Sequence, residues 1–314
     1  MLSFWIKAQD KLQSGCRLFL ALVVDHSKGS PGTKQAALLV SDDDEHFGTI
    51  GGGAMELDLL DEAKRLLALD SFKPHLETLM HRSTEDGNAS GLYCGGSQTL
   101  LKIILRQGNL PVVKEVVNCL EKDKTGSLIF SPTGVQLTEE NLSKPSISSV
   151  SGENWMVEWG LLNRKRVLVV GCGHCGSALA KQMDLLGYHV VVNEPREDLN
   201  TVQELSSRTV VRSFPYDKAG SGIEHAALTF ALVMTPSYPD DVDALSSLLS
   251  LPFPYIGVMG SSAKLNLIKK ALLAKGHSDS DWSRIIAPAG LAIDSDTPQE
   301  IAVSVAAQIL KEMP

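Results

Sequence analysis

A glycine-rich turn placed directly after a short apolar strand is the feature that most constrains this fold. Residues 165–170 read Lys-Arg-Val-Leu-Val-Val and run straight into the turn Gly171-Cys172-Gly173-His174-Cys175-Gly176. The three glycines of the turn have the G-x-G-x-x-G spacing of dinucleotide-binding folds, although such a match is weak by itself. The residues on both sides of the turn therefore decide what the pattern means.

The sequence after the turn completes a strand–helix–strand unit. Apolar side chains recur through residues 177–186 with the spacing of a buried helix, and Gly187 suits the helix C-cap. A second apolar strand, residues 189–193, then ends at Glu194. This context favours a Rossmann-type fold.

Each glycine of the turn has a physical role in such a fold. We expect Gly171 to allow the tight turn, Gly173 to let a pyrophosphate approach the backbone, and Gly176 to let the helix pack closely on the strand. The following helix, expected from about Ser177, would offer the free N–H groups of its start to an anion, and His174 in the turn is a further candidate contact. The alternative is a Rossmann fold that binds no ligand.

Two further groups in this half are candidate ligand contacts. Glu194 is expected to accept hydrogen bonds from a ribose diol, or Arg196 to bind a phosphate in its place. A glycine-serine turn, Gly260-Ser261, follows an apolar run at the expected carboxyl edge of the sheet. It predicts a second anion site, with an ordinary strand-to-helix turn as the alternative.

Strand and helix patterns alternate through the rest of this half. The intervening segments are mostly long enough for right-handed crossovers. The pattern predicts an α/β fold in which residues 151–314 form a Rossmann-like doubly wound parallel sheet. The six expected strands are residues 166–170, 189–193, 209–213, 228–234, 255–259 and 285–287.

Residues 1–150 predict a separate, mixed α/β domain. Helical patterns occur at residues 1–15, 54–69 and 112–123. Strand patterns occur at residues 17–25, 36–41, 47–50, 75–82, 98–105, 128–130 and 135–137. The Ser-, Glu- and Pro-rich residues 138–152 are interpreted as the linker to the second domain.

A run of three glycines joins a strand to a helix in the first domain. Gly51, Gly52 and Gly53 would expose consecutive backbone N–H groups at the helix start, which is an anion-binding geometry. Glu56 follows in the first helical turn, where it either caps the helix or contacts a ligand. A P-loop is excluded because no Lys-Ser/Thr pair follows the glycines.

The five cysteines predict no disulfide framework, because their number is odd and no secretion signal is recognised, so we expect a reducing cytoplasm. The thiol of Cys94, followed by Gly95 and Gly96, would be an exposed soft ligand or nucleophile, or an ordinary loop cysteine. Cys172 and Cys175 form a C-x-x-C pair, but a four-cysteine zinc site needs a second pair. No metal site is therefore expected.

The composition argues against two classes of partner. The formal net charge is −8, whereas binding to nucleic-acid phosphates needs an excess of Lys and Arg. No apolar run reaches the roughly 18 residues of a membrane span. No Ser-His-Asp order, paired-carboxylate signature or histidine-rich metal motif stands out, so no catalytic residue is assigned.

The two halves together resemble the XdhC/CoxI family, the accessory proteins of xanthine dehydrogenase and related molybdenum hydroxylases. In the first half the resemblance rests on residues 29–31 (GSP), 48–57 (GTIGGGAMEL) and 94–96 (CGG). In the second half it rests on residues 169–180 (VVGCGHCGSALA), 193–198 (NEPRED), 256–264 (IGVMGSSAK) and 288–310 (PAGLAIDSDTPQEIAVSVAAQIL). The order and spacing of these motifs cover nearly the whole chain.

The resemblance implies a chaperone that binds the molybdenum cofactor, molybdopterin with its metal. Such a protein protects the cofactor while a cysteine desulfurase adds a sulfur, and helps to insert it into the client hydroxylase. Carried over motif by motif, the implied cofactor contacts are Gly51, Gly52, Gly53 and Glu56, with residues 94–96 close by. We also expect a homodimer, and no catalytic turnover by the chain itself.

The chain departs from the family pattern at three positions. Ala54, after the glycine run of the first domain, stands where many members have a cysteine. Pro236, after the fourth strand of the second domain, stands where the family often has the histidine of a Thr-His-Asp motif. Ser262 stands where an arginine usually follows the glycine-serine turn. The chain therefore lacks a thiol, an imidazole and a cation. An NAD(P)-dependent oxidoreductase is the competing hypothesis, and an interaction scaffold without a small-molecule ligand is a third.

Overall fold

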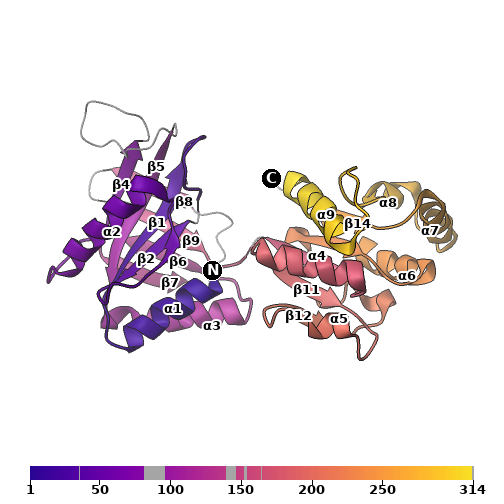
Figure 1. Cartoon of the computed structure of the whole chain (residues 1–314), viewed down its shortest axis with the longest axis horizontal. Coiled ribbons are helices and arrows are strands. Elements are labelled where there is room, and N and C mark those ends of the chain that lie inside the picture. Colours follow the sequence, from indigo (N-terminus) through magenta and orange to yellow (C-terminus); the bar gives the residue numbers. More distant parts are fainter. Residues whose placement is uncertain (35, 81–95, 139–145, 152–153, 164, 313–314) are drawn as a thin grey trace. The chain divides into compact units, whose positions relative to one another are not determined.

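The computed structural model describes residues 1–34, 36–80, 96–138, 146–151, 154–163 and 165–312. The chain divides into two compact units, Met1–Leu162 and Asn163–Pro314 (Figure 1). Each unit contains its own hydrophobic cores, so each has the means to fold around its own apolar residues.

A five-stranded antiparallel sheet forms the centre of the first unit. Its strand order is β3-β2-β1-β5-β4, so β1 lies in the middle. Seven consecutive residues of β1 are buried, because both faces of the sheet are covered. The strands are β1 (Leu18–His26), β2 (Ala37–Ser41), β3 (His46–Thr49), β4 (His75–Met80) and β5 (Ser97–Leu105).

Helices cover both faces of this sheet. The even-numbered residues of β1, from Leu18 to Val24, share a core with α1 and α3. The odd-numbered residues, such as Phe19, pack in a second core against α2. This alternation follows from the two-residue period of a strand. The helices are α1 (Leu2–Gln13), α2 (Gly53–Leu67) and α3 (Leu110–Glu121).

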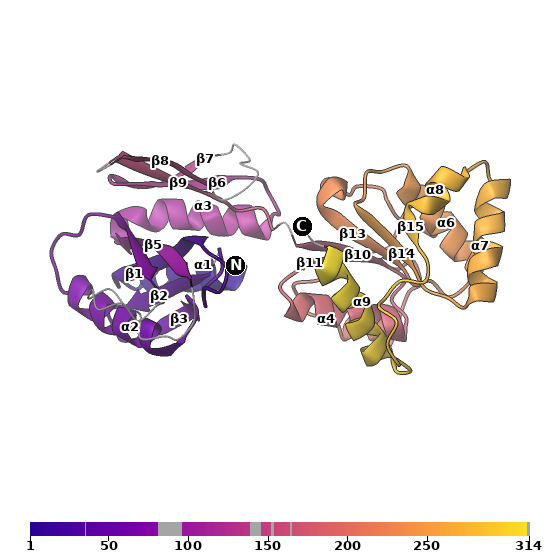
Figure 2. The same cartoon turned by 90° about the horizontal axis from the view of Figure 1, so that it is seen from above.

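A smaller antiparallel sheet forms an outer layer of the first unit, with strand order β7-β6-β9-β8. Figure 2 shows this sheet lying over α3, on the side of the helix away from the five-stranded sheet. Its inward side chains, including Phe130 and Trp159, join the core around α1 and α3. The strands are β6 (Ser127–Ser131), β7 (Gly134–Thr138), β8 (Ser146–Ser151) and β9 (Asn154–Gly160).

The first unit extends further along the chain than the sequence suggested. We expected a linker over residues 138–152 and a second domain from residue 151, but residues 146–151 form β8 and the unit ends at Leu162. The physical reason lies in β9, whose Trp155, Val157 and Trp159 alternate into the core. Residues 139–145 of the expected linker lie outside the described residues.

A six-stranded parallel sheet forms the centre of the second unit, which confirms the expected Rossmann-like fold. The order β12-β11-β10-β13-β14-β15 corresponds to 3-2-1-4-5-6 within the unit, and every neighbouring pair is parallel. In such sheets ligands bind where the order reverses, here at the carboxyl ends of β10 and β13. The strands are β10 (Arg166–Val170), β11 (His189–Asn193), β12 (Val210–Arg212), β13 (Thr229–Val233), β14 (Tyr255–Val258) and β15 (Ile285–Ile286).

Helices also cover both faces of the parallel sheet. Leu168 and Val170 of β10 pack in one core with α6 and α7, whereas Val167 and Val169 pack in another with α4 and α9. The main helices are α4 (His174–Leu185), α6 (Tyr238–Leu249), α7 (Ser262–Ala274) and α9 (Pro298–Glu312). The shorter ones are α5 (Asn200–Gln203), α8 (Asp279–Ser283) and the 3₁₀ turns η2 (Tyr216–Lys218) and η3 (Ala226–Leu228), whereas the 3₁₀ turn η1 (Gln107–Asn109) precedes α3 in the first unit.

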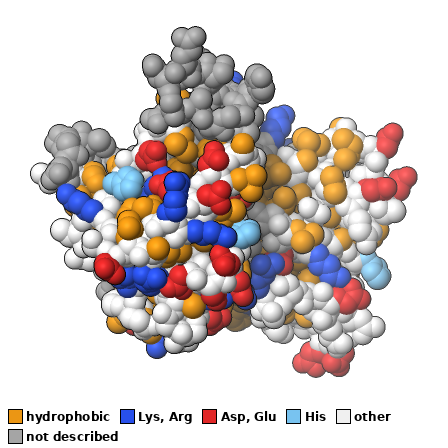
Figure 3. All heavy atoms as spheres, turned by 60° about the vertical axis from the view of Figure 1, so that its left-hand side comes forward, with side chains coloured by type: hydrophobic (Ala, Val, Ile, Leu, Met, Phe, Trp, Pro, Cys, Tyr) orange, Lys and Arg blue, Asp and Glu red, His pale blue; other side chains and the backbone are white. Residues whose placement is uncertain are grey.

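Charges of both signs are mixed on the displayed surface. Figure 3 shows acidic and basic side chains interspersed on the face that it presents. Among the described residues, no helix combines the length and the apolar character that crossing a bilayer requires.

The extent of the first unit can be tested with two fragments. We expect residues 1–162 to unfold cooperatively in urea, because they keep β9 and its buried tryptophans. A fragment ending at residue 150 loses three core side chains of β9 and should show no cooperative transition, measured by tryptophan fluorescence and circular dichroism. Equal cooperativity in the two fragments would contradict the structural role assigned to β9.

Candidate functional site

The glycine turn of the second unit follows β10 and has the geometry that each glycine requires. Gly171 has a φ of +97°, and a Cβ there would lie 2.4 Å from the carbonyl oxygen of Met234. A Cβ on Gly176 would lie 2.0 Å from the carbonyl oxygen of Gly171. A Cβ on Gly173 would meet nothing within 4 Å. The first and third glycines thus permit close packing, and the second leaves open space above the turn.

The start of α4 leaves backbone N–H groups without helical partners beside this turn. Gly173 is the N-cap residue, and no side chain caps the helix there. The exposed His174 opens the first helical turn, whose N–H groups have no partner within a helix. Thr201 holds the turn from outside, because its hydroxyl donates to the carbonyl oxygen of Cys172 at 2.5 Å. The helix start therefore offers backbone donors in a fixed position.

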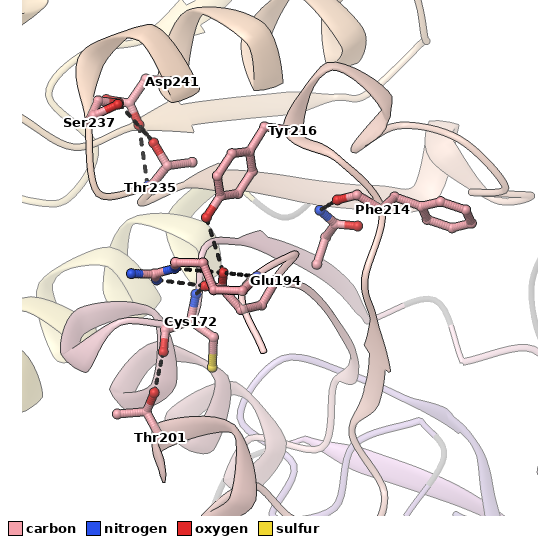
Figure 4. Close-up of polar contacts among 10 residues, drawn as sticks. Cys172, Glu194, Thr201, Phe214, Tyr216, Thr235, Ser237 and Asp241 are labelled. Atoms are coloured by element: carbon pink, nitrogen blue, oxygen red, sulfur yellow. Dashed lines mark hydrogen bonds and ion pairs between the residues drawn. The ribbon is translucent and has the colours of Figure 1, made fainter. Parts of the chain in front are cut away.

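Glu194, at the end of β11, holds the same turn from within. Its side chain is fully buried, and its Oε2 accepts the backbone N–H of Cys172 at 2.6 Å (Figure 4). Arg196 donates from Nε to Oε1 and from Nη2 to Oε2, both at 2.8 Å, and from its backbone N–H to Oε1 at 3.0 Å. The hydroxyl of Tyr216 donates to Oε1 at 3.2 Å. Glu194 and Arg196 are thus each other's main partner.

These contacts set the protonation of the buried groups. Burial alone would raise the pKa of Glu194, but the hydrogen bonds from Arg196 and from the Cys172 amide outweigh it and lower that pKa. Burial, with the nearby charge of Glu194, raises the pKa of Cys172 to about 11, and burial also raises the pKa of Cys175. Both cysteines are therefore protonated thiols at neutral pH, which does not suit a metal ligand or a nucleophile.

The second expected anion turn, Gly260-Ser261, lies at the start of α7. Ser261 is the N-cap residue, and its hydroxyl accepts the backbone N–H of Lys264 at 3.3 Å. The ammonium group of Lys264 lies 2.5 Å from Oδ2 of Asp241, a fully buried carboxylate. The Thr235 hydroxyl donates to Oδ1 of Asp241 at 2.6 Å. The cation nearest this turn is therefore already paired within the protein.

The glycine run of the first unit has a strongly constrained backbone. Gly51, Gly52 and Gly53 all have positive φ, at +129°, +76° and +73°. Oε2 of Glu56 accepts the backbone N–H groups of Ile50 at 3.0 Å and Gly52 at 3.1 Å. Glu56 thus braces the turn in the manner of a capping carboxylate, one of its two expected roles.

Three glycine-containing segments of the first unit meet around Gln98, a buried residue of β5. Its Oε1 accepts the backbone N–H of Gly32 at 3.2 Å, and its Nε2 donates to the carbonyl oxygen of Ile50 at 3.4 Å. The backbone also fits closely: a Cβ on Gly51 would lie 2.7 Å from the Gly32 nitrogen, and one on Gly96 would lie 2.7 Å from Oγ of Ser27. The glycines of these three segments are thereby brought together at one end of the central strands of the sheet. Cys94 and Gly95 lie outside the described residues.

Sequence reasoning missed several residues that organise these sites. Gln98 is a polar side chain at the start of an apolar strand, which is a usable signal for a buried hydrogen-bonding hub. Tyr216 and Asp241 carry no comparable signal, because their partners are distant or lie outside any motif. Among the residues that the structure describes, no three His, Cys, Asp or Glu side chains are grouped to hold a metal ion.

The glycine turn of the second unit can be tested by two alanine substitutions. Gly176→Ala should destabilise the protein by about 3 kcal/mol, because the new Cβ meets a backbone carbonyl that cannot move freely. Gly173→Ala should cost about 1 kcal/mol or less, since its Cβ enters open space. Urea unfolding monitored by circular dichroism compares the two variants, and equal losses of stability would contradict the assigned roles.

The bracing role of Glu194 predicts a pH dependence. Its folded-state pKa is lowered from about 4.5, so its stabilisation is complete above that pH and is lost as the pH falls through the folded-state pKa. Glu194→Gln should therefore reduce the free energy of unfolding by about 2 kcal/mol at pH 7, and by progressively less below pH ~4.5.

The matched control for this experiment is Glu204→Gln, which removes an exposed carboxylate that pairs with Lys181. Its stability should stay close to that of the unchanged protein at every pH. Urea unfolding between pH 7 and pH 3 measures both variants. A difference between Glu194→Gln and the unchanged protein that stays constant over this range would show that the carboxylate charge is not what braces the turn.

Two family models match the sequence, one in each unit. The model described as the XdhC Rossmann domain matches residues 167–309, and the model described as the XdhC and CoxI family matches residues 12–78. A crystal structure of a xanthine dehydrogenase from Bacillus halodurans has a similar fold, with a TM-score of 0.73 over 98% of this chain and 95% of that chain. At 22% sequence identity this likeness concerns the fold alone.

Two curated proteins are similar in sequence to this chain over part of their own length. The uncharacterized protein YqeB of Escherichia coli K12 is 28% identical over 301 residues, which are 95% of this chain and 44% of that protein. A probable xanthine dehydrogenase subunit of Bacillus subtilis 168 is 29% identical over 149 residues, which are 47% of this chain and 43% of that protein. The matched residues thus cover less than half the length of each relative. With both of its units matched by models of one family, the chain belongs to the XdhC/CoxI family.

Proposed function

We propose that this chain is an accessory protein of a xanthine dehydrogenase-type molybdenum hydroxylase and that it binds the molybdenum cofactor of that enzyme. Family membership implies the accessory role. The observation that carries the cofactor proposal is the meeting of three glycine-containing segments around Gln98 in the first unit. Such a surface lets a ligand approach the backbone closely, since no side chains cover it.

The start of α2 fits the phosphate of molybdopterin. No side chain caps this helix, and its first-turn residues Gly53, Ala54 and Met55 have N–H groups without partners inside the helix. A Cβ on Gly52 would meet nothing within 4 Å, so there is open space beside these donors. A phosphate placed there would be stabilised by the backbone N–H groups and by the helix dipole.

Glu56 fits a different part of the same ligand. Its Oε2 accepts the turn amides, as well as the hydroxyl of Thr49 at 2.5 Å. No hydrogen bond to its Oε1 occurs within the described part of the chain. A pterin ring presents adjacent N–H donors, which a carboxylate oxygen accepts. We therefore assign Glu56 to the pterin end of the ligand and the start of α2 to the phosphate end.

The remaining parts of the proposal come from the family resemblance. Bound cofactor would supply molybdenum and dithiolene sulfurs, for which a soft thiol such as that of Cys94 is a suitable neighbour. The proposed partners are the client hydroxylase and a cysteine desulfurase, which adds the terminal sulfur. We further propose that the chain acts as a homodimer in the cytoplasm.

The competing function is an NAD(P)-dependent oxidoreductase. The parallel sheet and its glycine turn favour a nucleotide, since both have the form found in dinucleotide-binding folds. Chemistry on that nucleotide would also need a positioned acid or base. Glu194 and Tyr216 are engaged with each other and with Arg196, and Asp241 is paired with Lys264. The accessory role is therefore the better supported function.

The cofactor site can be tested with a glycine substitution that blocks the open space. Gly52→Ala should weaken the binding of molybdopterin by about tenfold or more, because its Cβ occupies the position where the phosphate would lie. Binding is measured by titrating the purified chain with molybdopterin and by the fluorescence of the pterin released from it. Thermal melting of the variant shows whether it remains folded.

Gly134→Ala is the matched control for backbone strain. Gly134 also has a positive φ, +134°, with nothing within 4 Å of its Cβ position, and it lies in the β6–β7 hairpin of the smaller sheet. It should suffer a similar loss of stability and bind molybdopterin normally. Equal binding by both variants, or no binding by the unchanged chain at micromolar concentrations, would refute the proposed site.

A further inference from the structure

The carboxylate of Glu194 has no capacity left for a ribose. It accepts five hydrogen bonds, three at Oε1 and two at Oε2. An ionised carboxylate offers about four lone-pair sites, so all of them are in use. If Glu194 accepted hydrogen bonds from a ribose diol, it would have to give up an existing charge-assisted bond, which is costly in a buried position.

Arg196 lies beside the glycine turn, and its Nη1 group is not used in the pairing with Glu194. Its Nη2 and the backbone N–H of Cys172 donate to the same oxygen of Glu194, so the guanidinium group is held directly beside the turn. Its Nε is also bonded to Glu194, and the guanidinium group interacts with the hydroxyl of Tyr216 too, whereas Nη1 makes no hydrogen bond to Glu194. The side chain is 40% exposed, so part of it is open to a ligand.

We propose that the second unit binds an adenosine nucleotide phosphorylated at the ribose 2′ position, as in NADP, and that Arg196 selects that phosphate. In a sheet of this strand order the pyrophosphate lies on the glycine turn, and the adenosine ribose lies at the end of the second strand, here β11. The space above Gly173 is open to the pyrophosphate. Arg196 follows β11 by three residues, which places its guanidinium group where the ribose substituent lies.

The roles of the two residues explain the selectivity. Glu194 orients the guanidinium group through two parallel bonds and fixes the turn, so it is a positioning residue. A 2′-phosphate would gain a charge-assisted bond from Nη1 of Arg196, whereas a 2′-hydroxyl would gain a weaker one. In NAD-specific sites an acidic residue at this place accepts a hydrogen bond from the ribose hydroxyl, but Glu194 has no lone pair left to do so. This proposal is independent of cofactor binding by the first unit.

The test is isothermal titration of the full chain with NADPH, NADH, 2′,5′-ADP and 5′-AMP. NADPH should bind about tenfold or more tightly than NADH, and 2′,5′-ADP should exceed 5′-AMP by a similar factor. Arg196→Ala should abolish both differences. Arg196→Lys keeps the charge beside Glu194 but loses the planar fork, so it should retain only part of the preference.

Arg208→Ala is the matched control variant. Arg208 donates to Asp184 at 2.8 Å in the same unit. It lies just before β12, at the amino ends of the parallel strands, whereas the glycine turn lies at their carboxyl ends. Its loss should leave the nucleotide preference unchanged, and thermal melting shows whether each variant is folded. The proposal is overturned if NADPH does not bind, if NADH binds as tightly as NADPH, or if folded Arg196→Ala keeps the preference.

Discussion

Both units depend on the same interaction, in which a carboxylate of the chain accepts backbone N–H groups of a glycine-rich turn. Glu56 does this in the first unit and Glu194 in the second. A turn built from residues of positive φ, such as Gly51 and Gly171, directs its amides away from the regular sheet and helix partners. Buried amides without partners are costly, and a charged acceptor compensates for them. The shape of each turn is therefore fixed before any ligand arrives.

An internal carboxylate also changes which ligand groups a glycine turn can accept. A phosphate that approached the braced amides directly would meet a negative charge, so it must use the next N–H groups along the helix or an adjacent cation. In the first unit those groups are at the start of α2, beside the open space over Gly52. In the second unit the start of α4 and the guanidinium group of Arg196 are both available.

The sequence was most informative where the period of apolar residues was clear. All six strands of the parallel sheet were located to within a residue or two, because they form short apolar runs. β10, β13 and β14 are buried along their whole length, whereas Val210 and Val211 of β12 are exposed. β8 was missed because Ser-rich segments read as linkers, and β9 was missed although Trp155 and Trp159 alternate with polar residues. The partners of Glu56 and Glu194 could not be predicted, since local motifs do not specify which way a carboxylate turns.

Two of the three departures from the family pattern, Pro236 and Ser262, follow β13 and β14 at the carboxyl ends of the parallel strands. Ser262, where arginine is usual, is exposed at the start of α7, and the nearby Lys264 pairs with the buried Asp241. Thr235 donates to the same carboxylate, so the polar groups that follow β13 and β14 satisfy one another. Lys264 carries a compact charge that lies against Asp241, whereas the planar guanidinium group of Arg196 pairs with Glu194 through Nε and Nη2 and has a further nitrogen besides. We therefore place the proposed ligand-selecting charge of this unit at the end of β11, where the side chain of Arg196 is partly exposed.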